Sequence, residues 1–265
     1  LVQPNIVGND IKDIKPSEEL TWDEIKGKYP NVKFPEGMQL KYAEAYAQNT
    51  DLVGWLKIDK LKMDFPILQT DNDSYYLKRS FTHRYTDLGN PFLAHANSIE
   101  PLDRNSIIYG HSTRSSDKIF SKLFDYRTTR GFINNPIIEF NTIYHDYKWK
   151  VYAVFITNAT TAEDNGYFFN YVWTNISEAS FEQYIAELDS RKLYTTGVNI
   201  KPTDKILTLS TCLYEFDNAR LVVVARMVRD GESEEVDTSL VKTNPNPRYP
   251  QAWYNQDKKH NPYKI

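Results

Sequence analysis

The feature that most constrains the fold is a series of short strand-like runs between residues 51 and 228. The last two runs, KILTLSTC (205–212) and ARLVVVARMV (219–228), are rich in β-branched residues and flank a short polar loop. The earlier runs are DLVGWLKI (51–58), MDFPILQT (63–70), PFLAHA (91–96), NSIIYGH (105–111), NPIIEFNTI (135–143) and YKWKVYAVFITNA (147–159). About eight runs, mostly at hairpin spacing, predict a mainly β protein with a closed or partly closed barrel rather than alternating βαβ units.

Helical patterns lie outside these runs or in the connections between them. Thr21 followed by Glu24 is a capping-box pattern and predicts a short helix over 21–29. Further helices are expected over 38–50, 115–126 and 176–193. The last of these falls between the sixth and seventh strands.

The chain divides into three parts by composition. Residues 1–50 form an N-terminal extension with helices, and residues 51–229 form the barrel. Residues 230–265 are polar and rich in proline, a composition that by itself predicts disorder. Trp253 and Tyr254 are the side chains best suited to hold this C-terminal extension on the barrel.

The composition excludes several classes of function. A net charge of −3 gives no basic face for nucleic acid. The longest apolar run, LVVVA (221–225), is far too short to span a membrane. The sequence contains no cysteine pair, HExxH, GxGxxG or P-loop motif, so we expect neither a metal nor a cofactor.

Cys212 is the only cysteine in the chain. Free cysteines are among the most often buried residues, so an inert core position is one interpretation. However, Cys212 ends a strand-like run just before a polar loop, and functional residues concentrate where strands meet loops. Its position therefore favours a nucleophile, which requires a nearby base or cation.

The partner of the thiol is sought among five histidines. His111 follows an apolar run and a glycine, and so lies at a strand exit as Cys212 does. His95 also falls at a strand end, but its context is weaker and we favour His111. Arg220 begins the strand after the Cys212 loop, where a hairpin would bring it level with the thiol as an oxyanion donor.

These residues resemble a known family. TLSTC (208–212), an arginine eight residues later, and YGH (109–111) are similar to the motifs of sortases, the cysteine transpeptidases of Gram-positive cell surfaces. The resemblance extends from about Asp51 to Val228 and implies an eight-stranded sortase-type barrel. DLVGWLKI, DNDSYYL and the helix at 178–189 are similar to class B members in particular.

The resemblance implies a role for each site residue. Cys212 would be the nucleophile, His111 the acid and base, and Arg220 the group that holds the carbonyl oxygen. Ser210 and Thr211 would line the groove for the sorting motif, and Tyr171 would stand on its opposite wall. The motif would be of the LPxTG or NPxTN kind, cleaved after its threonine through a thioacyl-enzyme.

The resemblance also implies partners and a location. Surface proteins or pilins that carry the motif would be joined to an amine of peptidoglycan or of a pilin, at the outer face of the membrane of a Gram-positive bacterium. Members of the family usually have an N-terminal membrane anchor, and the chain begins at Leu1 rather than at a methionine, so we expect that an anchor has been removed.

Three features depart from the family pattern. The C-terminal extension is longer than expected for class B. Some relatives carry an acid shortly after the cysteine, where this chain has Tyr214, so only Glu215 or Asp217 could serve in that way. The Asp-Pro-aromatic lid motif of class C is missing. Two other interpretations remain open: a cysteine protease that hydrolyses surface peptides, and a non-catalytic barrel that binds them.

Overall fold

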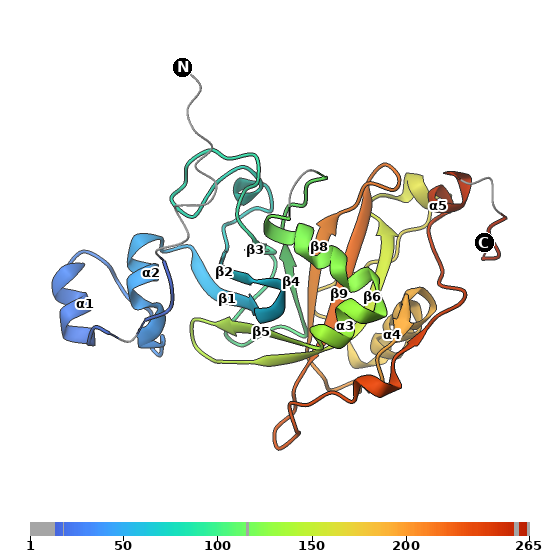
Figure 1. Cartoon of the computed structure of the whole chain (residues 1–265). Coiled ribbons are helices and arrows are strands. Elements are labelled where there is room, and N and C mark those ends of the chain that lie inside the picture. Colours follow the sequence, from blue (N-terminus) through green and yellow to red (C-terminus); the bar gives the residue numbers. More distant parts are fainter. Residues whose placement is uncertain (1–13, 18, 115–116, 257–259, 264–265) are drawn as a thin grey trace.

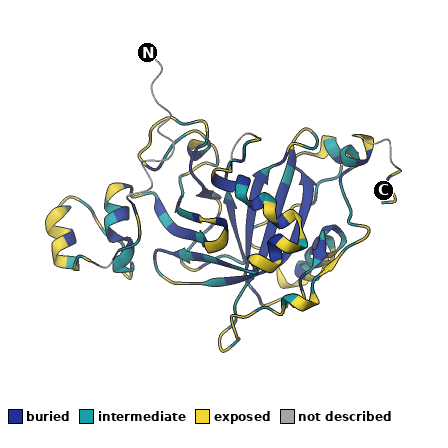
Figure 2. Cartoon of the chain, in the orientation of Figure 1, coloured by how far each residue is buried: buried dark blue, intermediate teal, exposed yellow. Residues whose placement is uncertain are grey.

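The structure is a computed structural model that describes residues 14–17, 19–114, 117–256 and 260–263. Figure 1 shows two small helices beside a β-barrel, with further helices and the C-terminal extension on its other side. Buried residues concentrate in the barrel strands, whereas the N-terminal helices are buried on one face only (Figure 2).

The N-terminal helices follow local sequence signals. Helix α1 spans Trp22–Lys28, and the capping box of Thr21 and Glu24 is present as predicted. The helix expected over 38–50 is shorter: a 3-10 turn, η1 (Leu40–Tyr42), leads into α2 (Ala43–Gln48). Both pack with β1 and β2 around a cluster that includes Trp55 and Tyr42.

Eight strands of the described chain close the barrel, in the order β1-β2-β3-β4-β8-β9-β6-β5. The predicted closed, mainly β architecture is therefore confirmed. The strands are β1 (Leu52–Ile58), β2 (Met63–Leu68), β3 (Phe92–Leu93), β4 (Asn105–Tyr109), β5 (Ile137–Thr142), β6 (Lys148–Asn158), β8 (Ile206–Cys212) and β9 (Ala219–Met227).

Two of the pairings are parallel and could not be expected from hairpin spacing. Strand β2 pairs with β3 at a single position, and β4 pairs with β8 along its whole length. Because parallel neighbours end at the same edge of a sheet, the chain leaves β4 and β8 at one end of the barrel. The segments that follow β4 and β8 therefore lie side by side.

The connections carry the remaining elements. The helix predicted between the sixth and seventh barrel strands is present as α4 (Glu178–Arg191), which packs on β6. The helix expected over 115–126 begins at residues outside the described range, and its described part is the 3-10 helix η4 (Ile119–Arg127). The other connecting elements are η2 (Asp59–Leu61), η3 (Tyr75–Leu77), α3 (Thr129–Asn134), η5 (Thr161–Asp164) and β7 (Tyr194–Thr195).

The C-terminal extension, residues 230–265, contacts the rest of the protein at several of its described residues. It contains η6 (Thr238–Leu240), β10 (Lys242–Thr243) and α5 (Gln251–Gln256). Tyr254 is buried, and Trp253 is partly buried against the core cluster that fills the barrel. Trp253, one of the two aromatic residues expected from the sequence, therefore packs on the barrel core, whereas Tyr254 contacts Tyr249 within the extension.

Candidate active site

The two faces of β8 have different surroundings, and these show which side chains of TLSTC point into the barrel and which point outward. Leu207 and Leu209 belong to the cluster inside the barrel, whereas Ile206 belongs to the cluster under α4. Because side chains alternate along a strand, Ser210 and Cys212 leave the barrel on its outer face and Thr211 points inward.

Cys212 and Arg220 lie directly opposite each other in the antiparallel pair of β8 and β9. Residues at such paired positions project from the same face of the sheet. The hairpin predicted from the sequence therefore brings Arg220 level with the thiol. Both side chains are partly exposed, and Cys212 is a free thiol.

His111 reaches the same region from the neighbouring strand. In the parallel pair of β4 and β8, Tyr109 lies beside Ser210, and the Gly110 amide donates to the Ser210 carbonyl at 3.2 Å. Beyond the paired residues the two segments stay side by side, because Thr211 donates to the Gly110 carbonyl and Ser112 donates to the Cys212 carbonyl. The backbone of His111 thus runs alongside that of Cys212, although 101 positions separate them in the sequence.

The environment of His111 disfavours the charged form of its ring. Burial lowers its pKa below the ordinary value of 6.5, and the charges of Lys78 and Arg220 lower it further, whereas the Leu77 backbone and Asp87 raise it. The Nε2 atom is buried and has no hydrogen-bond partner among the described residues. The ring therefore has a free nitrogen that can accept a proton.

Tyr171 covers the outer face of β8 just before the thiol. Its side chain is buried, and its hydroxyl lies 3.2 Å from Ser210 Oγ. Burial raises the pKa of Tyr171, and the Ser210 hydrogen bond and the Arg220 charge lower it in part. Tyr171 and Ser210 therefore lie on the same outer face as Cys212 and Arg220, with both side chains buried.

Thr211 has a different position from the one expected. Its side chain is buried, and its hydroxyl donates to the Gly110 carbonyl at 2.7 Å. The contact joins β8 to the residue that precedes His111. The side chain of Thr211 does not lie on the face of the barrel that carries Cys212.

A second set of contacts, which no sequence motif indicates, links the residues that follow β4 to those that follow β8. Ser112 Oγ donates to the Cys212 carbonyl at 2.5 Å, and the Tyr214 hydroxyl donates to the Ser112 carbonyl at 2.6 Å. The Arg114 guanidinium lies 4.8 Å from the Tyr214 ring centre and donates to its carbonyl at 3.0 Å. The only sequence signal for these residues was their place next to His111 and Cys212.

The two acids after the cysteine have separate surroundings. Glu215 forms an ion pair with Arg127 at 2.6 Å, and its carboxylate accepts the Tyr214 amide at 3.1 Å. Asp217 is exposed in the loop. His95, the other histidine at a strand end, pairs with Asp73 at 3.0 Å.

The described residues include no group of three or more histidine, cysteine and acidic side chains that could hold a metal ion. Within the same described part of the chain, no helix is long and apolar enough to cross the hydrocarbon core of a membrane.

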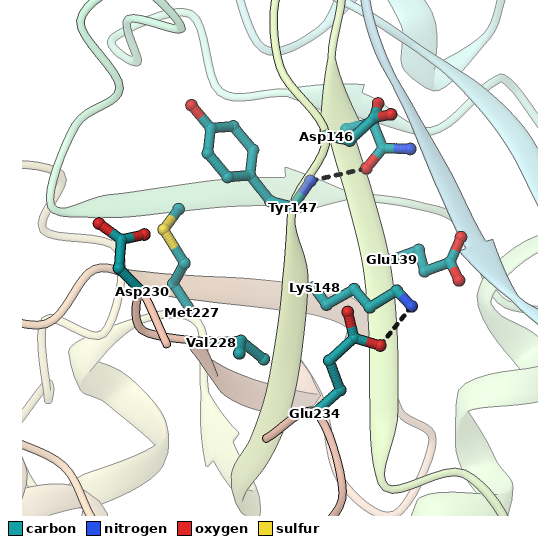
Figure 3. Close-up of a pocket in the computed structure, with 9 residues that line it drawn as sticks. Glu139, Asp146, Tyr147, Lys148, Met227, Val228, Asp230 and Glu234 are labelled. Atoms are coloured by element: carbon teal, nitrogen blue, oxygen red, sulfur yellow. Dashed lines mark hydrogen bonds and ion pairs between the residues drawn. The ribbon is translucent and has the colours of Figure 1, made fainter. Parts of the chain in front are cut away.

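A pocket of about 410 Å³ lies at the other end of the barrel, where β6 begins and β9 ends. It is rich in acidic side chains, and Lys148 pairs there with Glu234 at 2.5 Å (Figure 3). None of Cys212, His111 and Arg220 lines this pocket.

Comparisons with known proteins agree with the geometry. The model of the sortase domain matches residues 56–228. The sortase B of Listeria monocytogenes is 31% identical over 183 residues, which cover 68% of this chain and 71% of that protein. The sortase B of Staphylococcus aureus is 27% identical over 217 residues, which cover 80% of this chain and 85% of that protein.

A solved structure gives the same result at the level of the fold. The Staphylococcus aureus sortase B in complex with a substrate superposes with a TM-score of 0.65 at 26% identity, over 78% of this chain and 91% of that chain. The family model covers more than half of the chain, and the eight-stranded barrel matches. The chain therefore belongs to the sortase family, as a class B member and hence a cysteine transpeptidase.

Proposed function

We propose that Cys212, His111 and Arg220 are the catalytic residues of this sortase, and that it cleaves a sorting motif of the LPxTG or NPxTN kind after its threonine. The observation that carries the proposal is that the end of β8, the start of β9 and the end of β4 lie side by side. Cys212 lies opposite Arg220, and His111 follows the strand that runs parallel to β8. The three residue types are those needed for acyl transfer through a thiol.

In the acylation step, the Cys212 sulfur attacks the threonine carbonyl carbon of the motif. The neutral His111 ring accepts the thiol proton at Nε2, which has no hydrogen-bond partner among the described residues. The ring then gives this proton to the leaving amine as the peptide bond breaks. The products are a thioester on Cys212 and a free amine.

In the second step, an incoming amine attacks the thioester carbonyl and loses a proton to His111. The tetrahedral intermediate expels the Cys212 thiolate and releases the new amide, and the thiolate recovers its proton. The thiolate takes this proton from His111, which returns the ring to its neutral form. The histidine thus acts as base, acid, base and acid in turn.

Arg220 stabilises the negative oxygen of both tetrahedral intermediates. One of its N–H groups donates to the Ala219 carbonyl at 3.0 Å, which holds the guanidinium along the strand. The planar guanidinium carries five donors, so further N–H groups remain for the substrate carbonyl oxygen.

The outer face of β8 forms one wall of the motif groove in this proposal. Ser210 and Tyr171 are buried on that face with their hydroxyls 3.2 Å apart, so in this proposal they support the wall against which the motif binds. Thr211 supports the site indirectly, because its hydroxyl holds β8 to the backbone just before His111.

The partners follow from the class. The acyl donors are surface proteins or pilins that carry the motif, and the acceptor is an amine of peptidoglycan or of a pilin. The enzyme acts at the outer face of the cell membrane of a Gram-positive bacterium. The relatives that support this assignment are sortase B proteins of two Gram-positive species.

A peptide assay tests the function. The protein is incubated with LPxTG-type and NPxTN-type peptides, with and without an amine such as triglycine, and the products are separated by liquid chromatography and mass spectrometry. We expect an amide product that requires both the amine and Cys212. If the peptide is cleaved but only the hydrolysis product forms, even with added amine, the protein is a hydrolase. If neither peptide reacts, a binding module is favoured.

A further inference from the structure

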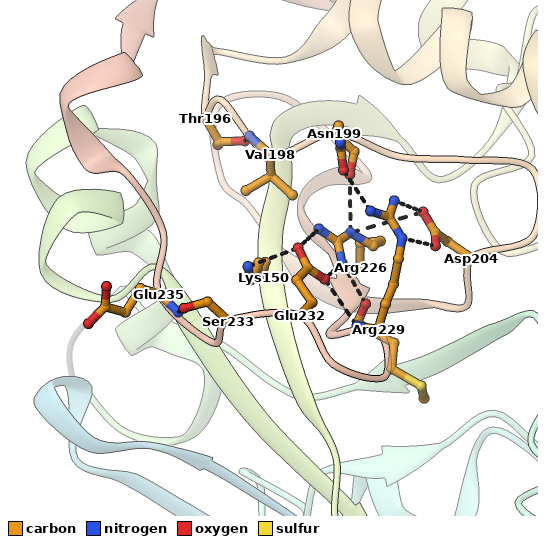
Figure 4. Close-up of polar contacts among 11 residues, drawn as sticks. Lys150, Thr196, Val198, Asn199, Asp204, Arg226, Arg229, Glu232, Ser233 and Glu235 are labelled. Atoms are coloured by element: carbon orange, nitrogen blue, oxygen red, sulfur yellow. Dashed lines mark hydrogen bonds and ion pairs between the residues drawn. The ribbon is translucent and has the colours of Figure 1, made fainter.

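The C-terminal extension is attached to the barrel by a buried ion cluster at its beginning. The side chain of Arg226, near the end of β9, is only 1% exposed and forms an ion pair with Glu232 of the extension. Glu232 also binds Lys150 of β6 at 3.0 Å and accepts the Arg229 amide at 3.0 Å (Figure 4). These contacts lower the pKa of Glu232 and fix the start of the extension at the end of the barrel remote from Cys212.

From this point the extension runs back along α4 and β7. Strand β10 pairs with β7 in antiparallel register. The Asn244 amide donates to the Leu193 carbonyl at 2.9 Å, and the Arg248 amide donates to the Ser190 carbonyl at 2.8 Å. Backbone hydrogen bonds of this kind set the path of the chain whatever its side chains are.

Arg248 then joins the extension to the connection between β6 and α4. Its guanidinium lies 3.8 Å from Asp164 at the end of η5, 3.8 Å from Glu187 of α4, and 4.7 Å from the Tyr167 ring centre. The side chains of Arg248 and Asp164 are 14% and 9% exposed, so solvent screens this pair less than a surface pair. The Gln251 amide also donates to Asp164, at 2.8 Å.

The segment held in this way, residues 159–177, contains Tyr171. The Asp164 carbonyl accepts the Tyr167 amide at 2.9 Å. A residue that fixes the position of Asp164 therefore also restrains Tyr167, four residues before Tyr171. Tyr171 in turn reaches Ser210 at 3.2 Å, two residues before the thiol.

The same turn also contacts the loop that leads to Arg220. Asn218 donates to Glu163, the neighbour of Asp164 in η5, at 2.8 Å. Asn218 has a left-handed backbone with φ of 57°, a conformation that a side-chain hydrogen bond helps to hold. It lies two residues before Arg220 in the sequence.

We propose that the C-terminal extension is a positioning element for the motif groove: Arg248 holds Asp164 and Tyr167, and thereby fixes the wall that carries Tyr171 against Ser210. This inference rests on the proposed function, because it assigns the extension to the binding of the same sorting motif. The side chain of Arg248 contacts Asp164, Glu187 and Tyr167, so we assign it a positioning role that acts through the wall.

The test compares the kinetics of four full-length variants with whichever of the LPxTG-type and NPxTN-type peptides the wild type turns over faster. Arg248→Met removes the guanidinium and keeps an apolar stem, and Arg248→Lys keeps the charge. Asp164→Asn keeps an oxygen for the Gln251 amide but loses the ion pair. Lys242→Met is the matched control, because it also removes one positive charge from the extension, at an exposed position.

We expect Arg248→Met to raise KM for the peptide about fivefold, in proportion to the loss of a partly buried ion-pair and cation–π contact, with kcat within about twofold of wild type. Asp164→Asn should raise KM in the same direction, Arg248→Lys should restore part of the loss, and Lys242→Met should match wild type. All assays are run well below the lowest melting temperature of the set.

Comparing the changes in KM and kcat distinguishes a positioning role of Arg248 from a role in fold stability alone. If Arg248 only stabilised the fold, its loss would reduce the fraction of active enzyme, so kcat would fall with KM unchanged, and that result would overturn the inference. An Arg248→Met variant with wild-type KM and kcat would also overturn it, while the proposed function would stand. A wild-type protein that acts on neither peptide would overturn the proposed function and the inference with it.

Discussion

Cys212 and Arg220 face each other directly across the β8–β9 pair, and this register aligns a thiol with a guanidinium on the outer face of the barrel. The pairing continues along the strands to Ile206 and Arg226, so the position of Arg220 is fixed by the whole ladder rather than by a flexible loop. A donor held in this way needs little rearrangement when the oxyanion forms.

The first prediction concerns the geometry of that donor. Arg220→Lys should lower kcat/KM for a sorting peptide about 100-fold, because an ammonium is a point charge and cannot reproduce the planar fork of the guanidinium. Steady-state kinetics measures the loss. The matched control is Arg130→Lys, at an exposed position on α3, and it should behave as wild type. Near-normal turnover by Arg220→Lys would remove Arg220 from the oxyanion role.

A second prediction concerns the hydrogen bonds between the two strand exits. Tyr214→Phe deletes the bond to the Ser112 carbonyl, and Ser112→Ala deletes the bond to the Cys212 carbonyl. Each should lower kcat by about an order of magnitude, because small displacements of reacting groups are costly. Tyr85→Phe, at an exposed tyrosine, is the control. If Tyr214→Phe and Ser112→Ala both keep the wild-type kcat, these two hydrogen bonds are not needed for the reaction.

The third prediction follows from the lowered pKa of His111. Nuclear magnetic resonance titration of its ring should give a pKa below 6.5, since burial disfavours the charged form. The unfolded chain then binds a proton more readily than the folded one, so stability falls as the pH drops through about 6.5. Wild type should accordingly lose more unfolding free energy between pH 7.5 and 5.5 than His111→Gln does. A ring pKa at or above 6.5 would contradict this assignment.

The fourth prediction uses two glycines with opposite surroundings. A Cβ at Gly110 would lie 2.6 to 2.8 Å from ring atoms of the buried Phe120, so Gly110→Ala should destabilise the fold by about 1–3 kcal/mol and disturb His111 beside it. A Cβ at Gly27, in α1, meets nothing within 4 Å, and Gly27→Ala should stabilise by up to about 1 kcal/mol. Urea unfolding measures both. Equal effects of the two changes would show that the contact with Phe120 is easily relieved.

Local patterns predicted the strands of the barrel well, since each run alternates or is rich in β-branched residues. The same patterns could not predict that β4 pairs in parallel with β8, because the register Tyr109 with Ser210 depends on contacts between distant parts of the chain. That pairing is what brings His111 level with Cys212. The sequence context of His111, at a strand exit after Gly110, made it the favoured partner of Cys212, and the resemblance to sortases agreed with that choice.

The C-terminal extension shows a different limit. Its polar composition predicts disorder, because average hydropathy does not register specific ion pairs. The structure holds it through Glu232, Arg248 and a short strand pairing, none of which changes the composition. Thr211 shows a third limit: proximity to Cys212 in the sequence does not place a side chain on the same face of a strand.

The most direct test of the proposed mechanism is the detection of an acyl group on Cys212. Wild-type protein is mixed with a sorting peptide, quenched in acid and analysed as an intact protein and as a digest by mass spectrometry. The mechanism predicts a mass increase equal to the peptide fragment that ends at threonine, located on Cys212, lost on addition of an amine and absent in Cys212→Ala. Amide product formed by Cys212→Ala, or an acyl group found on any other residue, would contradict it.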